Sequence, residues 1–233
     1  PAHARLRKLH PHPPRSHPLM AAFDAIAAAS RSLRRLLLDR MTTAAAVTLA
    51  PPDIQPAGIN AARVNLYLFE VQEHAGLRNQ PFRPRERDSG HPPLSLTLRY
   101  LLTTHPLVED LPDSDLIAQS LLGDALLTLH DFGGRIEELS LLTNRAGAIG
   151  DRLIDAALAG EPERLKITLH PAPAEELTKL FAAMPNTNFR RAAVIDVSVV
   201  QLEPRLPRRA AAPVEVRRLM ATGARPPRIR AAY

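Results

Sequence analysis

Residues 92–103 alternate hydrophobic and polar side chains with the period of a β-strand. Leu94, Leu96, Leu98, Tyr100 and Leu102 alternate there with Ser95, Thr97 and Arg99. A period of two predicts a strand that buries one face and leaves the other face polar.

Residues 64–80 contain a second strand-like pattern. Val64, Leu66 and Leu68 fall on one face, and Tyr67, Phe69 and Val71 fall on the other. Because both faces are apolar, this pattern predicts a central strand that is covered on each side. A Pro- and Arg-rich loop joins it to the strand in residues 92–103.

Two long segments have the period of an amphipathic helix. In residues 20–41, one stripe holds Phe23, Ile26, Leu33, Leu37 and Met41, and arginines lie elsewhere. A second helix is expected from Asp113 or Ser114, either of which can cap it, to about His130, before Gly133 and Gly134. The residues expected to face inward are Ile117, Leu121, Leu122, Ala125 and Leu129.

The shorter segments complete the expected order of elements. Pro173 and two glutamates suit a first helical turn, and Leu177, Leu180, Phe181 and Met184 continue that helix as an apolar stripe. Strands are expected over residues 45–49, 165–169 and 192–202, and a further helix over 148–158. In the last strand, Ile195, Val197 and Val199 alternate with Asp196 and Ser198.

This order predicts an α+β fold in which a mixed or antiparallel sheet packs with helices, instead of regular βαβ winding. The 233 residues suit one large domain with appendages. We expect the domain over residues 20–203, with extended arms over 1–19 and 204–233.

Positive charge is concentrated in the two expected arms. Residues 1–19 hold four cationic residues and no acid, and residues 204–233 hold eight arginines against Glu215 alone. Because the whole chain carries +6, residues 20–203 are net acidic. The first arm is rich in His and Pro, which predicts disorder, and Met20 is a candidate first residue. The second arm has enough apolar residues, including Val214 and Val216, to act as an extended arm or an added strand.

The sequence shows no constellation typical of a catalytic or metal site. It has no cysteine, which removes thiol chemistry and fits a reducing cytosol. No apolar run approaches the roughly 20 residues that span a bilayer. Gly133-Gly134 lacks the rest of a phosphate loop and suits a helix end. His74, His91, His105 and His170 have no compact ligand spacing, so the expectation is that the chain binds no metal and no cofactor.

The remaining polar groups also have simple structural interpretations. The adjacent His130 and Asp131 suit acid–base chemistry, but a helix C-terminus favours a histidine in any case. The acidic cluster of Glu109, Asp110, Asp113 and Asp115 is most simply a solvated turn at a helix start. No serine lies in a nucleophile elbow. An enzyme would need a site assembled from distant segments, and the expectation is that the chain is not an enzyme.

The arginines leave a nucleic-acid-binding or adaptor protein open as an alternative. Arg78, Arg83, Arg85 and Arg87 of the central loop, with the basic arms, suit phosphate contacts. Aromatic residues are only 4% of the chain, however, so a base-stacking platform is not expected. Basic arms that dock on an acidic protein surface explain the same charges.

The ordered segments resemble the N-terminal domain family of the cap, or tail-terminator, proteins of extracellular contractile injection systems, which are phage-tail-like particles. The resemblance covers most of residues 20–204. It is carried by VNLYLFEVQEHAGLRNQ (64–80), PPLSLTLRYLLT (92–103), LLTLHDF (126–132), LKITLHPAPAEELTKLFAAM (165–184) and AAVIDVSVVQLEP (192–204).

The resemblance implies a structural subunit without catalytic activity. It implies a six-fold ring of this chain at the end of the inner tube and sheath distal to the baseplate, which stops their polymerisation. The implied partners are further copies of the chain and the tube and sheath proteins, with no small-molecule substrate and no membrane. The implied location is the cytoplasm, within an assembled particle.

Beside this resemblance, we expect subunit, tube or sheath contacts in the central loop and the C-terminal arm. The candidate residues are Arg78, Asn79, Arg83, Arg85, Val214, Val216, Arg217 and Arg218. Arg78 and Asn79 stand beside a strand in a turn-like segment, where they suit hydrogen bonds between subunits.

Overall fold

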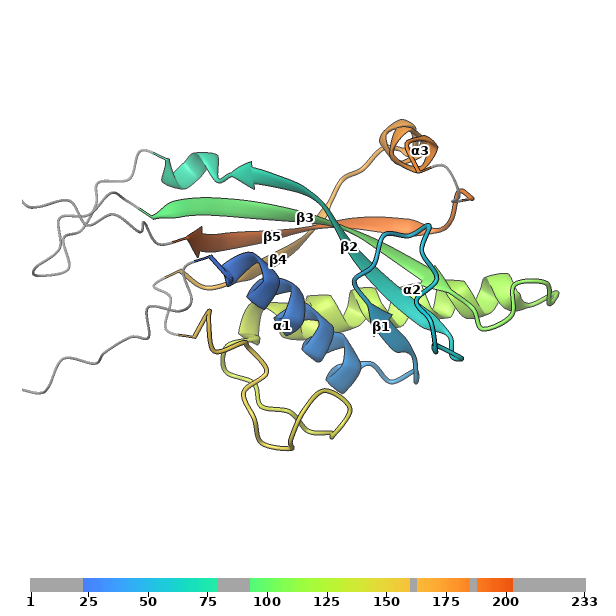
Figure 1. The fold of residues 1–233 in the computed structure, drawn as a ribbon, viewed down its shortest axis with the longest axis horizontal. Helices are drawn as coiled ribbons and strands as arrows, with labels where there is room; N and C mark the ends of the chain where they lie inside the picture. The colour runs from blue at the N-terminus through green and yellow to red at the C-terminus, as the bar shows by residue number, and fades with distance from the viewer. Residues whose placement is uncertain (1–22, 79–92, 160–162, 185–187, 203–233) are drawn as a thin grey trace, which may run out of the picture.

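The computed structural model describes residues 23–78, 93–159, 163–184 and 188–202. Its elements are three helices, five strands and two short 3₁₀ helices (Figure 1). The α-helices are α1 (Ala25–Arg40), α2 (Ser114–Phe132) and α3 (Ala174–Ala182), and the 3₁₀ helices are η1 (Ala75–Leu77) and η2 (Gly133–Arg135). The strands are β1 (Ala46–Thr48), β2 (Arg63–Glu73), β3 (Leu94–His105), β4 (Lys166–His170) and β5 (Ala192–Leu202).

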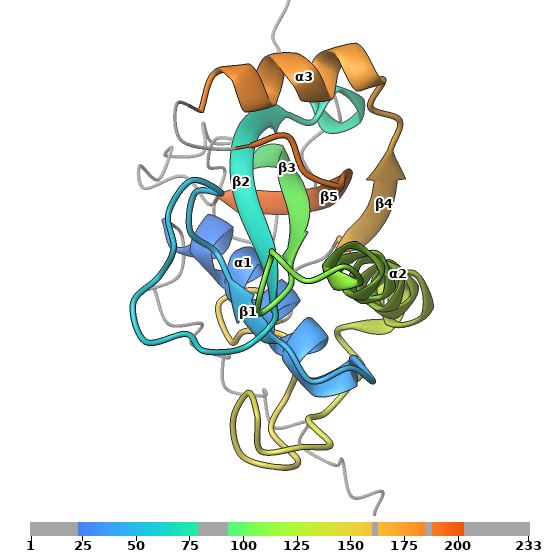
Figure 2. The same ribbon diagram turned by 90° about the vertical axis from the view of Figure 1, so that its right-hand side faces the viewer.

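The five strands form one mixed sheet in the order β1-β2-β3-β5-β4. β1 runs parallel to β2, and the other neighbouring pairs are antiparallel. The helices α1 and α2 cover one face of the sheet, and α3 lies on the other (Figures 1 and 2). The α+β prediction with a mixed sheet is therefore confirmed. The two expected arms lie outside the described residues.

The face that packs on α1 and α2 holds the main core. Leu96, Leu98, Tyr100 and Leu102 of β3 are buried there with apolar residues of α1, α2, β2 and β5, as the alternation predicts. The Tyr100 hydroxyl lies 2.8 Å from the Ser30 hydroxyl of α1, so its polar group is satisfied inside the core. Burial raises the pKa of Tyr100 to about 12.

The opposite face holds a smaller core beneath α3. Leu101, Val194 and Phe181 are buried there, and Tyr67 and Phe69 pack against them. β2 is thus covered on both faces, as its sequence predicts. β3 also buries Leu101 on this second face, which the expectation of a single buried face missed.

Two β-bulges move side chains from the faces that strict alternation predicts. The β2–β3 register shifts between Leu68 and Glu70, so Val71 stands opposite Leu98 and shares its face, not that of Tyr67. The β3–β5 register shifts between Leu96 and Thr97, so Val200, and not Val199, pairs with Leu96 on the core face. Each bulge adds one residue, and one residue inverts all later positions of a strand.

Three of the four predicted helices are confirmed, with shifted ends and some wrong assignments of which residues face the core. α1 begins at Ala25, and Phe23 before it is exposed. In α2, Leu121, Ala125 and Leu129 are buried as expected, but Ile117 is exposed and Ala118 takes its place. α2 ends at Phe132, immediately before Gly133, where any larger residue would place its Cβ only 3.0 Å from the Ile167 side chain of β4.

The helix predicted over residues 148–158 is wrong. Residues 136–159 form irregular turns, with one isolated bridge between Ser140 and Arg152. Gly150 has φ +91, a conformation that interrupts a helix, and its amide donates to Leu141. The apolar residues that suggested a helix, Leu153, Ile154 and Leu158, are buried in the main core from this irregular backbone.

Within the described part of the chain, no helix is long and apolar enough to span a membrane.

Candidate functional site

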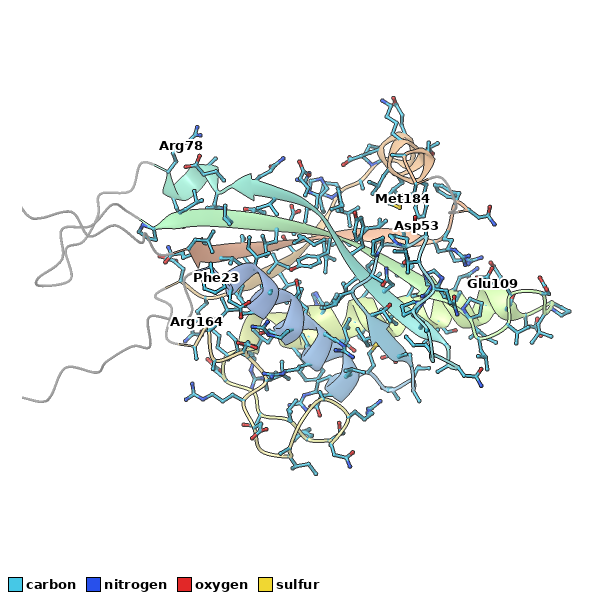
Figure 3. All side chains as sticks on the ribbon, in the orientation of Figure 1. Phe23, Asp53, Arg78, Glu109, Arg164 and Met184 are labelled. Carbon is cyan, nitrogen blue, oxygen red and sulfur yellow. The ribbon has the colours of Figure 1, made fainter. Side chains whose placement is uncertain are left out.

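Arg78 is the candidate contact residue that the structure describes. It follows η1 at one end of the long axis of the molecule, opposite the end that carries Glu109 (Figure 3). Its guanidinium donates through Nε and Nη2 to Glu73 Oε2, at 2.9 and 2.6 Å. This pairing raises the pKa of Arg78, and 65% of its side chain remains exposed. Arg78 is therefore accessible, but its charge is already neutralised.

The other candidate contacts, Asn79, Arg83, Arg85, Val214, Val216, Arg217 and Arg218, lie outside the described residues. They remain predictions.

The histidines hold separate structural positions. His74 Nδ1 lies 2.9 Å from the Thr97 hydroxyl, and His170 Nδ1 lies 2.9 Å from Asp196 Oδ2. His105 lies at the end of β3, and His130 lies in the last turn of α2. In the described ranges, no three His, Asp or Glu side chains are placed to hold a metal ion.

A row of charged side chains crosses the sheet on the face that carries α3. Arg99 of β3 pairs with Glu70 of β2 and Asp196 of β5, and Asp196 also meets His170 of β4. Burial opposes the charge of Arg99, but its two carboxylate partners outweigh burial and raise its pKa. Each charged group of this row has a partner within it, so the row links four strands of the sheet without leaving a charged group unpaired.

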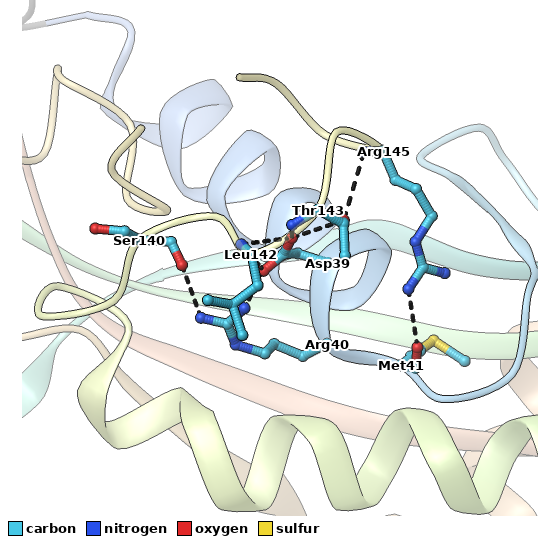
Figure 4. A network of polar contacts seen from close by, with 7 residues as sticks. All are labelled: Asp39, Arg40, Met41, Ser140, Leu142, Thr143 and Arg145. Atoms are coloured by element: carbon cyan, nitrogen blue, oxygen red, sulfur yellow. Dashed lines mark hydrogen bonds and ion pairs between the residues drawn. The ribbon is translucent and has the colours of Figure 1, made fainter. Parts of the chain in front are cut away.

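A buried carboxylate at the end of α1 fixes the irregular segment. Asp39 accepts hydrogen bonds from the Leu142 and Thr143 amides and the Thr143 hydroxyl, and pairs with Arg40 (Figure 4). Arg40 also donates to the Ser140 carbonyl, at 2.7 Å. Burial alone would raise the pKa of Asp39, but these donors and the Arg40 charge hold it below its usual value. The site is closed and structural.

A second buried ionisable cluster lies where β2 begins and β3 ends. Arg63 and His105 are directly opposite in the sheet, and the Arg63 Nη2 lies 3.0 Å from His105 Nδ1. Arg63 also donates through Nη1 to the Ile54 carbonyl, at 3.3 Å. A cavity of about 210 Å³ opens beside these two side chains and is also lined by Asn60, Leu107 and Glu109.

The charges of this second cluster disfavour additional positive charge. Burial, together with the charges of Arg63 and Arg190, lowers the pKa of His105 to about 3. Burial and then the Arg190 charge also lower the pKa of Arg63. Glu109 lies at the cavity, but it pairs with Arg190, which holds the Glu109 pKa below its usual value.

The acidic cluster at the start of α2 is more structured than the sequence predicts. Glu109 pairs with Arg190 and Asp115 pairs with Arg191, both from the segment before β5. Both carboxylates stay exposed, at 51% and 54% of their side-chain surface, so the expected solvated turn is confirmed, and the two ion pairs are an addition that the sequence did not predict. The connection before α2, which joins β3 to α2 over residues 106–113, exposes apolar side chains around these carboxylates. They are Leu107, Val108 and Leu111, and Leu116 of α2 is exposed beside them. Exposed apolar residues next to charged ones are typical of protein contact surfaces.

Arg63 and Arg190 are not site residues that the sequence predicts. Arg63 stands directly before the apolar run of β2, where a charged residue is normally a solvated strand end. The pairing of β2 with β3 places Arg63 beside His105, and no local pattern contains that pairing. The only available indication was a histidine at the end of a strand followed by an acidic segment.

Comparison with known proteins gives three findings. The model of the Pvc16 N-terminal domain family matches residues 28–216. The fold is similar to that of the PVC sheath/tube terminator of an extracellular contractile injection system in its extended state, with a TM-score of 0.52 and 15% identity, over 88% of this chain and 65% of that one. The anti-feeding prophage tube-terminating cap aligns with a TM-score of 0.44 and 14% identity, over 84% of this chain and 60% of that one.

This chain therefore spans less than two thirds of the length of either protein. A search of curated proteins gave no match.

Proposed function

Because the chain belongs to the Pvc16 N-terminal domain family, we propose that it is a structural subunit of the cap, or tail terminator, of a contractile injection system. The observation that carries this proposal is the family match over residues 28–216. The shared fold with a sheath/tube terminator supports it.

In this role the chain assembles with copies of itself, as a six-fold ring, on the end of the inner tube and sheath distal to the baseplate. The ring stops polymerisation of both structures. A closed ring needs complementary surfaces at two different places on each subunit. The exposed apolar connection before α2 and the opposite end of the molecule at Arg78 are available for such contacts. The particle is assembled in the cytoplasm and can be released from it.

The alternative of nucleic-acid binding gains no support from Arg78. Its guanidinium is paired with Glu73, so a phosphate would have to compete with a carboxylate already in place. Arg83 and Arg85 lie outside the described residues.

The test is to locate the chain in particles from the cells that produce it. An epitope-tagged chain, detected with gold in negative-stain electron micrographs, is expected at one end of rigid tubes of uniform length. Deletion of the gene is expected to give tubes of variable length, because nothing then ends their growth. Gold that labels no tubular particle, together with uniform tubes after deletion, would refute the cap role.

A further inference from the structure

The cluster of Arg63, His105, Glu109 and Arg190 beside the cavity carries an excess of positive charge. Arg63 is only 4% exposed, and among the described residues it forms no ion pair. Its donors reach a backbone carbonyl and an imidazole nitrogen, both of which are neutral acceptors. A buried charge without an opposite charge is costly, and proteins normally pair it.

His105 cannot supply a compensating charge, and its tautomer follows from its neighbours. A guanidinium only donates hydrogen bonds, so His105 Nδ1 must accept from Arg63. The proton of the neutral imidazole then lies on Nε2, which donates to the Thr103 hydroxyl at 3.2 Å. The imidazole therefore orients the Arg63 guanidinium without balancing its charge.

Glu109 does not fully balance the cluster either. Its carboxylate accepts hydrogen bonds from both Nη atoms of Arg190, so it already neutralises that guanidinium. The Arg190 Nε is a buried donor with no acceptor among the described residues. Arg63 and Glu109 line a cavity of about 210 Å³, which is large enough to admit a carboxylate group, and the pairing of Glu109 with Arg190 leaves two guanidinium groups to one carboxylate in the cluster.

The surroundings of the cavity favour a protein as the source of the missing negative charge. Leu107 lines the cavity and is 56% exposed, and Ile54, whose carbonyl accepts from Arg63, is 49% exposed. A free anion would leave these apolar side chains in water. A protein segment would bury them around a central charged contact, which is the usual anatomy of an interface anchored by arginine.

We propose that this cavity is a docking site for an Asp or Glu side chain of a neighbouring protein chain, with Arg63 as its anchor and Leu107 as its apolar rim. The proposal rests on the proposed function for the identity of the neighbour, which is a chain of the particle. The excess of positive charge beside the cavity does not depend on that function.

The first test measures the site in the isolated full chain. Thermal unfolding is compared in sodium chloride and in sodium acetate at equal ionic strength, with acetate as the carboxylate probe. Acetate is expected to raise the midpoint by about 1–3 °C, because a ligand of the folded state stabilises it by mass action. Arg63→Met is expected to abolish the increase, and Arg164→Met, which alters an exposed arginine paired with Glu138, is expected to keep it. An equal acetate effect in all three proteins would overturn the proposal.

The second test identifies the neighbour in assembled particles. Arg63→Lys places an amine in the cavity, and a zero-length carbodiimide joins that amine to a carboxylate in direct contact. Mass spectrometry is expected to find residue 63 joined to an Asp or Glu of another chain, with no such link from Arg164→Lys. A link only to Glu109 of the same chain would show that the cluster completes itself, and would overturn the proposal.

The two tests also separate this proposal from the cap role. An acetate effect that depends on Arg63, with links between copies of the purified chain but no chain in tubular particles, would sustain the docking site and reject the cap. A chain located at tube ends without the acetate effect would sustain the cap and reject the docking site.

Discussion

Asp39 and Arg63 are both buried and ionised, but their surroundings differ. The Asp39 carboxylate meets two amides, a hydroxyl and a guanidinium, and its side chain is fully enclosed. The Arg63 guanidinium meets only two neutral acceptors and borders a cavity. A buried charge with complete partners fixes the fold, whereas one with incomplete partners beside an open space is available for binding.

The largest effect on stability is expected from removing the Asp39 carboxylate, whose hydrogen-bonding partners are complete. Asp39→Ala leaves two backbone amides of the segment 136–159 and the Arg40 guanidinium without their acceptor. We expect a loss of about 3–5 kcal/mol in the free energy of unfolding, measured by urea denaturation. Glu138→Ala, which removes an exposed partner of Arg164, serves as the control and should leave the midpoint nearly unchanged. A small loss in Asp39→Ala would mean that the cluster does not hold the segment.

The next largest effect is expected from pH at His105. Its pKa is about 3 in the folded chain and near its ordinary value of 6.5 in the unfolded chain. The unfolded state therefore binds a proton that the folded state excludes, so stability is complete above about pH 6.5 and falls as the pH drops toward 3. Between pH 6.5 and 4.5 the loss is about 2.5 kcal/mol from this group.

The control for this pH effect is His105→Gln, which keeps a polar side chain but does not titrate. Carboxylates such as Asp39 and Glu109 titrate in both proteins, so the difference between the two unfolding curves isolates the imidazole. Parallel loss of stability in both proteins would show that His105 is protonated without cost.

Arg63→Met removes the buried charge that has only neutral hydrogen-bond acceptors. The substitution removes two hydrogen bonds but also removes a buried charge that has no ion-pair partner among the described residues. These effects oppose each other, so we expect the free energy of unfolding to change by less than about 1 kcal/mol. A loss as large as that of Asp39→Ala would show that Arg63 is a structural anchor, and the contrast between the two clusters would fail.

The same contrast explains which features were predictable from sequence. The period of two in β3 and the apolar stripe of α3 are local patterns, and both elements were predicted almost to their ends. The helix predicted over residues 148–158 is wrong because the backbone of the segment 136–159 is fixed by Asp39 and by a hydrogen bond from the Asp155 amide to Ser32, over 100 residues away in each case. The Arg63 cluster was missed for a related reason, since strand pairing creates it.

The smallest effect on stability is expected at Arg78, where an effect on assembly would be the more informative result. The side chain is largely exposed and pairs with Glu73, a surface contact of the kind that contributes little to folding. Arg78→Ala should therefore leave the thermal midpoint unchanged within error.

If Arg78 is also a contact between subunits, as its sequence position predicts, the same variant should form fewer rings, measured by mass photometry and negative-stain microscopy. Glu73→Ala separates the two roles, because it frees the Arg78 guanidinium without removing it and should preserve or strengthen a contact with a neighbouring carboxylate. Ring formation that is unchanged in Arg78→Ala would remove Arg78 from the interface and leave the apolar connection before α2 as the described surface for the contact.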